Sequence, residues 1–415
     1  MKVLYITGAC LTRNTSANMS HNAFVQGLLE NGCDVDIVMS SDSWGEEDQA
    51  LPIWDQARYY CFSSTSLPDR IRKKLHRKTQ ARALAADGVK DSPLDPQSQS
   101  GNWRKWLRAC LKRVFNAFFP RDPLYPLDST WLKRASSFRN AAKYDLVISN
   151  SSPAASHRLA LELIGKHHIA CERWIQIWED PWYHDLYGGH SELVEQEEHR
   201  LLQAASEIVY VSPLTLMYQK RYYPDCAEKM KCVPLPALRL EPGETCRAVD
   251  GKPSFGYFGD YYSQTRDLKP FYDALVASGF RGAIVGDSDI SLPSTDEILV
   301  SRRVTLDKLQ PIQDRTGILV HLSNLRGGQI PGKVYHYSVT DKPILFILDG
   351  TEEEKHALKD YFGQFDRYVF CENSEEQILD CLQAIAQGKQ NCKTVTAFFP
   401  NEIVKKLLSR KDQSK

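Results

Sequence analysis

The segment at residues 327–348 constrains the fold of this 415-residue chain more than any other segment. Its sequence, GGQIPGKVYHYSVTDKPILFIL, joins a glycine-rich turn to a short helical stretch and then to an apolar run. The glycines let the backbone approach a ligand closely. The apolar run at 344–348 follows a Lys-Pro break and predicts a buried parallel strand. Lys333 stands in the first turn of the expected helix, where free N–H groups favour an anion such as a diphosphate.

The beginning of the chain alternates in the same way. The pattern predicts a strand at 2–7, a loop at 8–19, a helix at 20–30 that Asn31-Gly32 ends, and a strand at 33–39. A strand, a helix and a second strand within forty residues form a βαβ unit, which implies a parallel sheet. Further strands are expected at 144–149, 174–178 and 207–212, with helices ending near His168 and Ala205.

The second half of the chain repeats this organisation. Four prolines between 224 and 242 precede Gly243 and indicate a linker, after which strands are expected near 254–258, 283–285, 304 and 318–322. The length allows two separate cores. We therefore predict an α/β protein with an N-terminal domain at 1–242, a C-terminal domain at 243–395 and a terminal helix at 396–415.

Composition excludes several classes of protein. Lys plus Arg and Asp plus Glu both number 52, so no global charge indicates nucleic-acid binding. Eleven cysteines without CxxC spacing, and no signal peptide, predict reduced thiols and a cytoplasmic location. No zinc motif is evident, and Asp287-Ser288-Asp289 matches a DxD metal motif only in its letters. No metal and no cofactor are expected.

A basic insertion is expected at about 62–126. Residues 70–121 carry fourteen Lys and Arg against three Asp, and apolar residues recur at helical spacing over 103–119. Such a helix can lie on an anionic membrane surface, which would place the protein peripherally on the inner face of the cell membrane. The same apolar stripe could equally pack against the N-terminal domain, with its cations in solvent.

The segment at 330–345 resembles the loop IPGK-hydrophobic-x-EY-x-x-x-GKPIL of bacterial family 4 (group 1) glycosyltransferases. The matching residues are Ile330, Pro331, Gly332, Lys333, Tyr337, Lys342, Pro343, Ile344 and Leu345. The resemblance implies a GT-B architecture, in which two doubly wound Rossmann-like domains face each other across a cleft. It also implies that this loop, with Gly328 and Gln329, holds a nucleotide-sugar donor.

The chain departs from that family at its paired acids. The family has Glu where this chain has His336, and an earlier acid where it has Gly328; Asp341 also replaces a Gly. Because a histidine can hydrogen-bond a diol, His336 is expected to meet the donor ribose.

A second match lies in the N-terminal half. The segments NSSPAASH and EDPW resemble the family's S-S-S-P-P-x-S-x-H and DPW, through Ser151, Ser152, Pro153, Ser156, His157, Asp180, Pro181 and Trp182. These residues follow expected strands, where ligands bind in open α/β sheets. His157 could orient or deprotonate an acceptor, and Asp180 could bind sugar hydroxyls. A core histidine and a loop cap are the alternatives. Ser152 and Asn18 are further acceptor-side candidates.

The remaining donor candidates are Gly259 and Arg266. Arg266 follows a glycine turn that ends at Gly259 and aligns with an Arg of the family's GR-D-P segment. A diphosphate leaving without a metal needs cations, so Arg266 and Lys333 are expected to clamp it. The alternative for Arg266 is a surface arginine beside Asp267.

Three functions remain open from the sequence. The resemblance implies transfer of a hexose from a nucleotide sugar to a glycan or lipid-linked acceptor in bacterial surface polysaccharide synthesis, with retention of configuration. The missing acids favour a binding or scaffold protein of the same shape that has lost catalysis. A nucleotide-sugar epimerase of this fold is the third.

Overall fold

The structure is a computed structural model of the 415-residue chain. It describes residues 1–13, 15–41, 51–66, 122–186, 191–238, 252–388 and 390–409. Most of the predicted basic insertion, including its 103–119 helix, lies outside the described residues. The predicted boundary between the domains, at 242/243, also lies outside them.

The first half of the chain folds into a seven-stranded parallel sheet in the order β3-β2-β1-β5-β7-β8-β9. Its strands are β1 (Lys2–Ile6), β2 (Asp34–Ser40), β3 (Arg58–Phe62), β5 (Leu146–Asn150), β7 (Trp174–Trp178), β8 (Glu207–Tyr210) and β9 (Met230–Cys232). Two short strands, β4 (Lys143–Tyr144) and β6 (Ala170–Cys171), pair separately. Tyr5 lies opposite Ile37 on one side and Ile148 on the other. Consecutive buried residues along β1, β5 and β7 fit a parallel sheet covered on both faces.

The second half folds into a six-stranded parallel sheet in the order β12-β11-β10-β13-β14-β15. Its strands are β10 (Ser254–Phe258), β11 (Arg281–Val285), β12 (Ile298–Ser301), β13 (Ile318–Leu322), β14 (Ile344–Leu348) and β15 (Tyr368–Glu372). In both sheets the chain first adds strands outward on one side of the first strand and then crosses to its other side. The crossing lies between β1 and β5 in the first sheet and between β10 and β13 in the second. The predicted α/β class, with two doubly wound parallel sheets, is confirmed.

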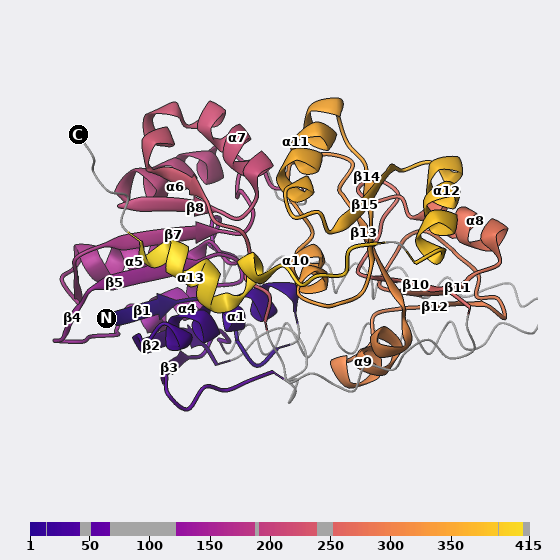
Figure 1. Ribbon diagram of the computed structural model, residues 1–415. Coiled ribbons are helices and arrows are strands. Elements are labelled where there is room, and N and C mark those ends of the chain that lie inside the picture. Colours follow the sequence, from indigo (N-terminus) through magenta and orange to yellow (C-terminus); the bar gives the residue numbers. More distant parts are fainter. Residues whose placement is uncertain are drawn as a thin grey trace, which may run out of the picture.

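Helices cover both sheets, and the sheets form separate lobes (Figure 1). The helices of the first lobe are α1 (Ser16–Glu30), α4 (Ser129–Ala135), α5 (Ala155–Gly165), α6 (Glu192–Ala204), α7 (Pro213–Tyr222) and η1 (Pro224–Lys229). The helices that come after β10 in the chain are α8 (Lys269–Ser278), α9 (Leu306–Arg315), α10 (Lys333–Ser338), α11 (Glu352–Gly363), α12 (Glu375–Ala386), η2 (Thr396–Phe398) and α13 (Pro400–Leu408). None of these described helices is long and apolar enough to span a bilayer.

The last helix, α13, returns to the first lobe and lies against α1 (Figure 1). A Cβ atom at Gly27 would lie 2.2 Å from the Pro400 carbonyl oxygen, so only glycine allows the two helices to come this close. Asn31 Nδ2 donates to the Asn401 carbonyl oxygen at 2.9 Å, and Arg173 donates to the carbonyl oxygen of Leu407 at 2.6 Å. These contacts hold α13 against the first lobe.

Helix starts differ from the sequence predictions because side chains cap them. α1 begins at Ser16, four residues before the predicted start, since Thr15 Oγ1 accepts the Asn18 N–H at 3.1 Å. α6 begins at Glu192, with Ser191 as its cap, whereas the sequence predicted a shorter helix, at 199–205. Such a cap typically contributes about 1 kcal/mol.

Two strand predictions are wrong. The predicted linker contains β9, which pairs with β8 through Ile208 and Met230. Val304 lies outside any strand; the edge strand is β12, and Thr305 after Val304 already precedes α9.

Candidate functional site

A cavity of about 360 Å³ lies between the two lobes. The first lobe contributes Ser16, Ala17, Met19, Ser152, Glu179, Asp180, Val211 and Leu235. The second lobe contributes Phe258, Gly259, Asp260, Arg266, Val285, Gly286, Arg303, Val304, Leu306, Leu309, Asn324 and residues 329–333. Many of these residues directly follow strands, so the cavity lies at the carboxyl ends of both sheets, where doubly wound proteins bind ligands.

The second lobe brings three cations to the cavity: Arg266, Arg303 and Lys333. Arg303 forms an ion pair with Asp260. Lys333, in contrast, makes no ion pair with any residue in the described part of the chain. Burial, and then the charge of Arg303, lower the pKa of Lys333 to about 8, while Asp260 opposes the shift. The cation wall therefore carries more positive charge than its own carboxylates neutralise.

The loop after β10 is held in place by its neighbour after β11. A Cβ atom at Gly286 would lie 1.9 Å from the Gly259 carbonyl oxygen, so a glycine is required there. The close approach lets Asp260 Oδ1 accept the N–H of Asp287 at 2.9 Å. Asp260 is thereby fixed at the cavity wall, where it positions Arg303.

The first lobe brings two adjacent carboxyl groups, Glu179 and Asp180, from the end of β7. Burial, and then the charge of Asp180, raise the pKa of Glu179 well above its usual range. Desolvation by the surrounding protein, and then the charge of Asp185, raise the pKa of Asp180 to about 6. The residue is nevertheless exposed to solvent. Glu179 Oε1 has no hydrogen-bond partner among the described residues. This oxygen is buried, and its hydrogen-bonding capacity is unused within the described part of the chain.

A buried glutamate on α6 positions the loop that carries these acids. Glu198 accepts the backbone N–H groups of Trp182 at 3.2 Å and Tyr183 at 2.7 Å. Tyr223, just before η1, donates its hydroxyl to the same carboxylate at 3.4 Å. Burial raises the pKa of Glu198 to about 7. The geometry of the acid loop therefore depends on the junction of α6 with η1.

The glycine-rich turn crosses from the second lobe to the first. The Gly328 carbonyl oxygen accepts hydrogen bonds from Ser212 Oγ at 2.6 Å and Thr215 Oγ1 at 3.2 Å. Gln329 Nε2 donates to Asp185 Oδ1 at 3.0 Å. Gly328 has a φ of +70°, and a Cβ there would lie 2.9 Å from Tyr218. This turn therefore links the lobes as well as lining the cavity.

The structure brings most of the predicted site residues together. Those that line the cavity are Ser152, Asp180, Gly259, Arg266, Gln329, Ile330, Pro331, Gly332 and Lys333. Those that do not are Asn18, His157, Gly328 and His336.

His157 lies beneath the cavity in the core of the first lobe. It is 0% exposed, its ring packs on Trp178 with centroids 4.1 Å apart, and its Nδ1 lies 2.8 Å from Ser149 Oγ. Burial lowers its pKa to about 3. The expectation that His157 meets the acceptor with a pKa near neutrality is therefore corrected in favour of the core alternative.

Asn18 and His336 are also absent from the cavity lining. Asn18 donates to the carbonyl oxygens of Cys10 and Arg13 at 2.9 and 2.8 Å, which holds the loop before α1. Burial, and then the charge of Lys333, lower the pKa of His336 to about 3. The structure therefore does not support direct ligand contact for either residue. A short motif gives the spacing of residues along a helix but does not show which face of the helix turns toward a cavity.

Sequence reasoning missed Arg303 and Asn324 and treated Glu179 only as a neighbour of Asp180. Arg303 follows β12, which was predicted at the wrong residues, so the arginine was not placed at the end of a strand. Glu179 could have been found, since it directly follows a strand that was predicted correctly.

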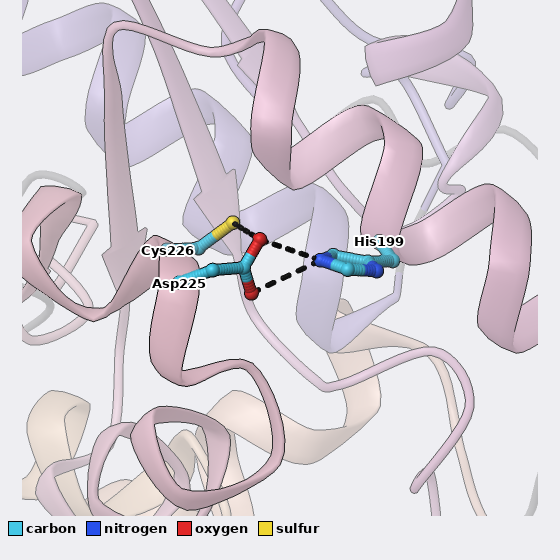
Figure 2. A group of neighbouring side chains, drawn as sticks. All are labelled: His199, Asp225 and Cys226. Atoms are coloured by element: carbon cyan, nitrogen blue, oxygen red, sulfur yellow. Dashed lines mark hydrogen bonds and ion pairs between the residues drawn. The ribbon is translucent and has the colours of Figure 1, made fainter.

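One group of metal-ligand side chains occurs in the described part of the chain, and it lies outside the cavity lining. It consists of His199, Asp225 and Cys226, whose ligand atoms lie within 4.8 Å of one another (Figure 2). Asp225 and Cys226 follow His199 by 26 and 27 positions, so no short motif indicates the group.

No protein-family model matches the chain, and a search of curated proteins found no match. Among solved structures, one described as trehalose-6-phosphate from E. coli bound with UDP-2-fluoro glucose is 10% identical, over 98% of this chain and 96% of that one, with a TM-score of 0.48. The lipopolysaccharide outer core galactosyltransferase WaaB is 12% identical, over 98% and 95%, with a TM-score of 0.46. A UDP-N-acetylglucosamine 2-epimerase is 12% identical, over 100% and 97%, with a TM-score of 0.47. Similarities this distant determine neither the substrate nor the activity of this chain.

Proposed function

We propose that this protein transfers a hexose from a nucleotide-sugar donor to a hydroxyl of a glycan or lipid-linked acceptor. The observation that supports the proposal is a single cavity with two chemically opposite walls. Arg266, Arg303 and Lys333 line one wall, and Glu179 and Asp180 line the other. Glycosyl transfer needs this division, because one substrate leaves as an anion while the other supplies a hydroxyl.

The cation wall is suited to the donor diphosphate. Lys333 is partly buried and makes no ion pair in the described part of the chain, so an anion would gain its charge without displacing a carboxylate. Arg266 lies in the same cavity and offers a planar group that can bind phosphate oxygens in pairs. Together they would stabilise the negative charge that develops as the diphosphate leaves.

The acid wall is suited to sugar hydroxyls. Glu179 Oε1 lacks a partner among the described residues, and Asp180 and Ser152 open to the same cavity. A carboxyl whose pKa is raised toward neutrality can accept or donate a proton near physiological pH. We assign Glu179 to the acceptor hydroxyl and Asp180 to hydroxyls of the transferred sugar.

The acceptor belongs to bacterial surface polysaccharide synthesis in this proposal, and transfer proceeds with retention and without a metal, as the family resemblance implies. A peripheral position on an anionic membrane would bring a lipid-linked acceptor to the cavity. Each cation of the basic insertion near the surface would contribute about 1 kcal/mol to binding, screened by salt. Co-sedimentation with anionic vesicles at low and high salt tests this part, and a protein that stays in solution at low salt would exclude it.

Incubation with a panel of nucleotide sugars, with and without oligosaccharide acceptors, tests the main proposal. Release of nucleoside diphosphate that depends on the acceptor is the expected result. Conversion of the donor to its epimer without an acceptor would identify an epimerase instead, which the adjacent carboxyl groups would also serve. Tight donor binding with neither product would identify a binding or scaffold protein, in line with the absence of acids at Gly328 and His336.

A further inference from the structure

We propose that His199, Asp225 and Cys226 form a binding site for Zn²⁺ at the junction of α6 and η1 (Figure 2). The site lies outside the cavity lining, and zinc would bind there whether or not the cavity carries out the proposed transfer. Its donors are an imidazole nitrogen, a carboxylate oxygen and a thiol sulfur, a set that suits zinc better than magnesium or calcium.

The three ligand atoms are already close to the spacing that a tetrahedral zinc ion requires. His199 Nε2 lies 2.8 Å from Asp225 Oδ2 and 3.1 Å from Oδ1, and Cys226 Sγ lies 3.7 Å from Asp225 Oδ2. Ligands at about 2.0–2.3 Å from zinc are separated by roughly 3.3–3.7 Å in a tetrahedron. The histidine and the carboxylate would need to separate by about 0.5 Å, and His199 Nε2 and Cys226 Sγ, which lie within 4.8 Å of each other, would need to come closer together.

A fourth donor stands at the same place. Gln203, one turn after His199 on α6, has its amide nitrogen 3.2 Å from His199 Nε2 and 3.1 Å from Asp225 Oδ2. Rotation of this amide would turn its oxygen toward the ion. The side chain of His199 is 38% exposed and that of Asp225 is 47% exposed, so water can also reach the fourth position.

The buried thiol distinguishes this group from an ordinary ion pair. His356 and Asp360 on α11 also form a histidine–carboxylate pair, at 3.3 Å, but both side chains are more than two-thirds exposed and no third ligand belongs to the pair. Cys226 is 1% exposed and closes the inner side of the group. Zinc would bind by replacing the thiol proton, which passes to solvent.

The position of the group suggests what the ion would do. His199 follows Glu198, the residue that holds the loop after Asp180, and its ring packs on Tyr223 with centroids 5.2 Å apart. Asp225 and Cys226 lie in η1, directly after Tyr223 and Pro224. An ion that joins α6 to η1 would therefore brace the element on which the acid wall of the cavity depends.

Zinc titration of the metal-free full-length protein, in competition with a chromophoric chelator, tests the proposal. The wild type is expected to bind Zn²⁺, and Asp225→Asn and Cys226→Ser are each expected to weaken binding by on the order of 100-fold, since even the loss of an outer-shell partner costs 10- to 100-fold. Asp225 is exposed, so its variant should fold even if the cysteine variant does not.

Co²⁺ supplies a second readout, because a cobalt–thiolate bond produces a charge-transfer absorption that a histidine–carboxylate pair cannot. This band is expected in the wild type and in the controls Cys171→Ser and His356→Ala, and should be absent from Cys226→Ser. Wild-type zinc affinity in either Asp225→Asn or Cys226→Ser, or a cobalt band that survives Cys226→Ser, would overturn the site and leave only an ion pair.

Discussion

The two lobes share one strand order but present opposite charges to the cavity between them. In each lobe the order of strands reverses beside the first strand, and the loops after the central strands reach the cavity. In the first lobe these loops carry Glu179 and Asp180, whereas in the second lobe they lie beside Arg266, Arg303 and Lys333. The comparison shows that the sheet decides where a site lies and the loops decide its chemistry.

The lobes also differ in how their charged groups are supported. Arg303 is paired with Asp260, so part of the cation wall is neutralised within its own lobe. Glu179 and Asp180 are adjacent acids with no arginine or lysine ion pair in the described part of the chain, and the pKa of each is raised. The first lobe therefore offers carboxyl groups that can change protonation, and the second offers charge. Each prediction below removes one side of this contrast.

Loss of a cation should have the largest effect. Lys333→Ala and Arg266→Ala are each expected to lower turnover by about 2–4 kcal/mol of transition-state stabilisation, or roughly 30- to 1000-fold, because the diphosphate loses a charged contact as it leaves. Steady-state kinetics measure the loss, and circular dichroism checks the fold. Lys308→Ala, an exposed lysine on α9, is the control. Near-normal turnover in both variants would show that these cations do not clamp a diphosphate.

Loss of the acid should come next and should affect the other substrate. Glu179→Ala is expected to lower kcat/KM for the acceptor by about 5- to 150-fold, because a buried polar group left without its hydrogen-bond partner costs roughly 1–3 kcal/mol. Donor affinity, measured separately by calorimetry, should change less than about threefold. The control is Glu376→Ala on α12. A variant that loses donor affinity instead would place Glu179 on the donor side, and the two walls would then not bind different substrates.

The pH dependence of donor binding should be smaller. The pKa of Lys333 is lowered to about 8, so its charge is complete below that pH and is lost as the pH rises through it. Donor affinity is therefore expected to be constant from about pH 6 to 7 and to fall above pH 8 by at most tenfold per unit. Lys333→Arg, which stays charged, should remove this slope. A slope that persists in Lys333→Arg would assign the titration to another group.

His336→Ala should have the smallest effect. The residue does not line the cavity, and a neutral imidazole there adds no charge to it. Donor affinity in His336→Ala is expected to change less than about threefold, by the same calorimetric titration. A loss of tenfold or more in the alanine variant would restore the ribose contact that the sequence suggested.

Parts of this molecule follow from the sequence alone. The strands at 174–178, 318–322 and 344–348 were predicted at the residues where they occur, because each is an apolar run bounded by polar or proline residues. Alternation of such runs with helices was enough to predict two parallel sheets. Strand ends then predicted Ser152 and Asp180 near a ligand, and glycine-rich turns predicted Gly259 and Lys333; all four residues line the cavity.

Only the tertiary structure decided which side chains face the cavity and which groups meet. Whether His157 turned to the cavity or to Trp178 depended on packing across the sheet, which no local pattern records. Arg303 reaches Asp260 over 43 positions, and His199 reaches Asp225 over 26, so neither pair has a local signature. The shifted pKa values of Lys333 and Glu179 have the same origin, because burial and neighbouring charge are properties of the folded chain.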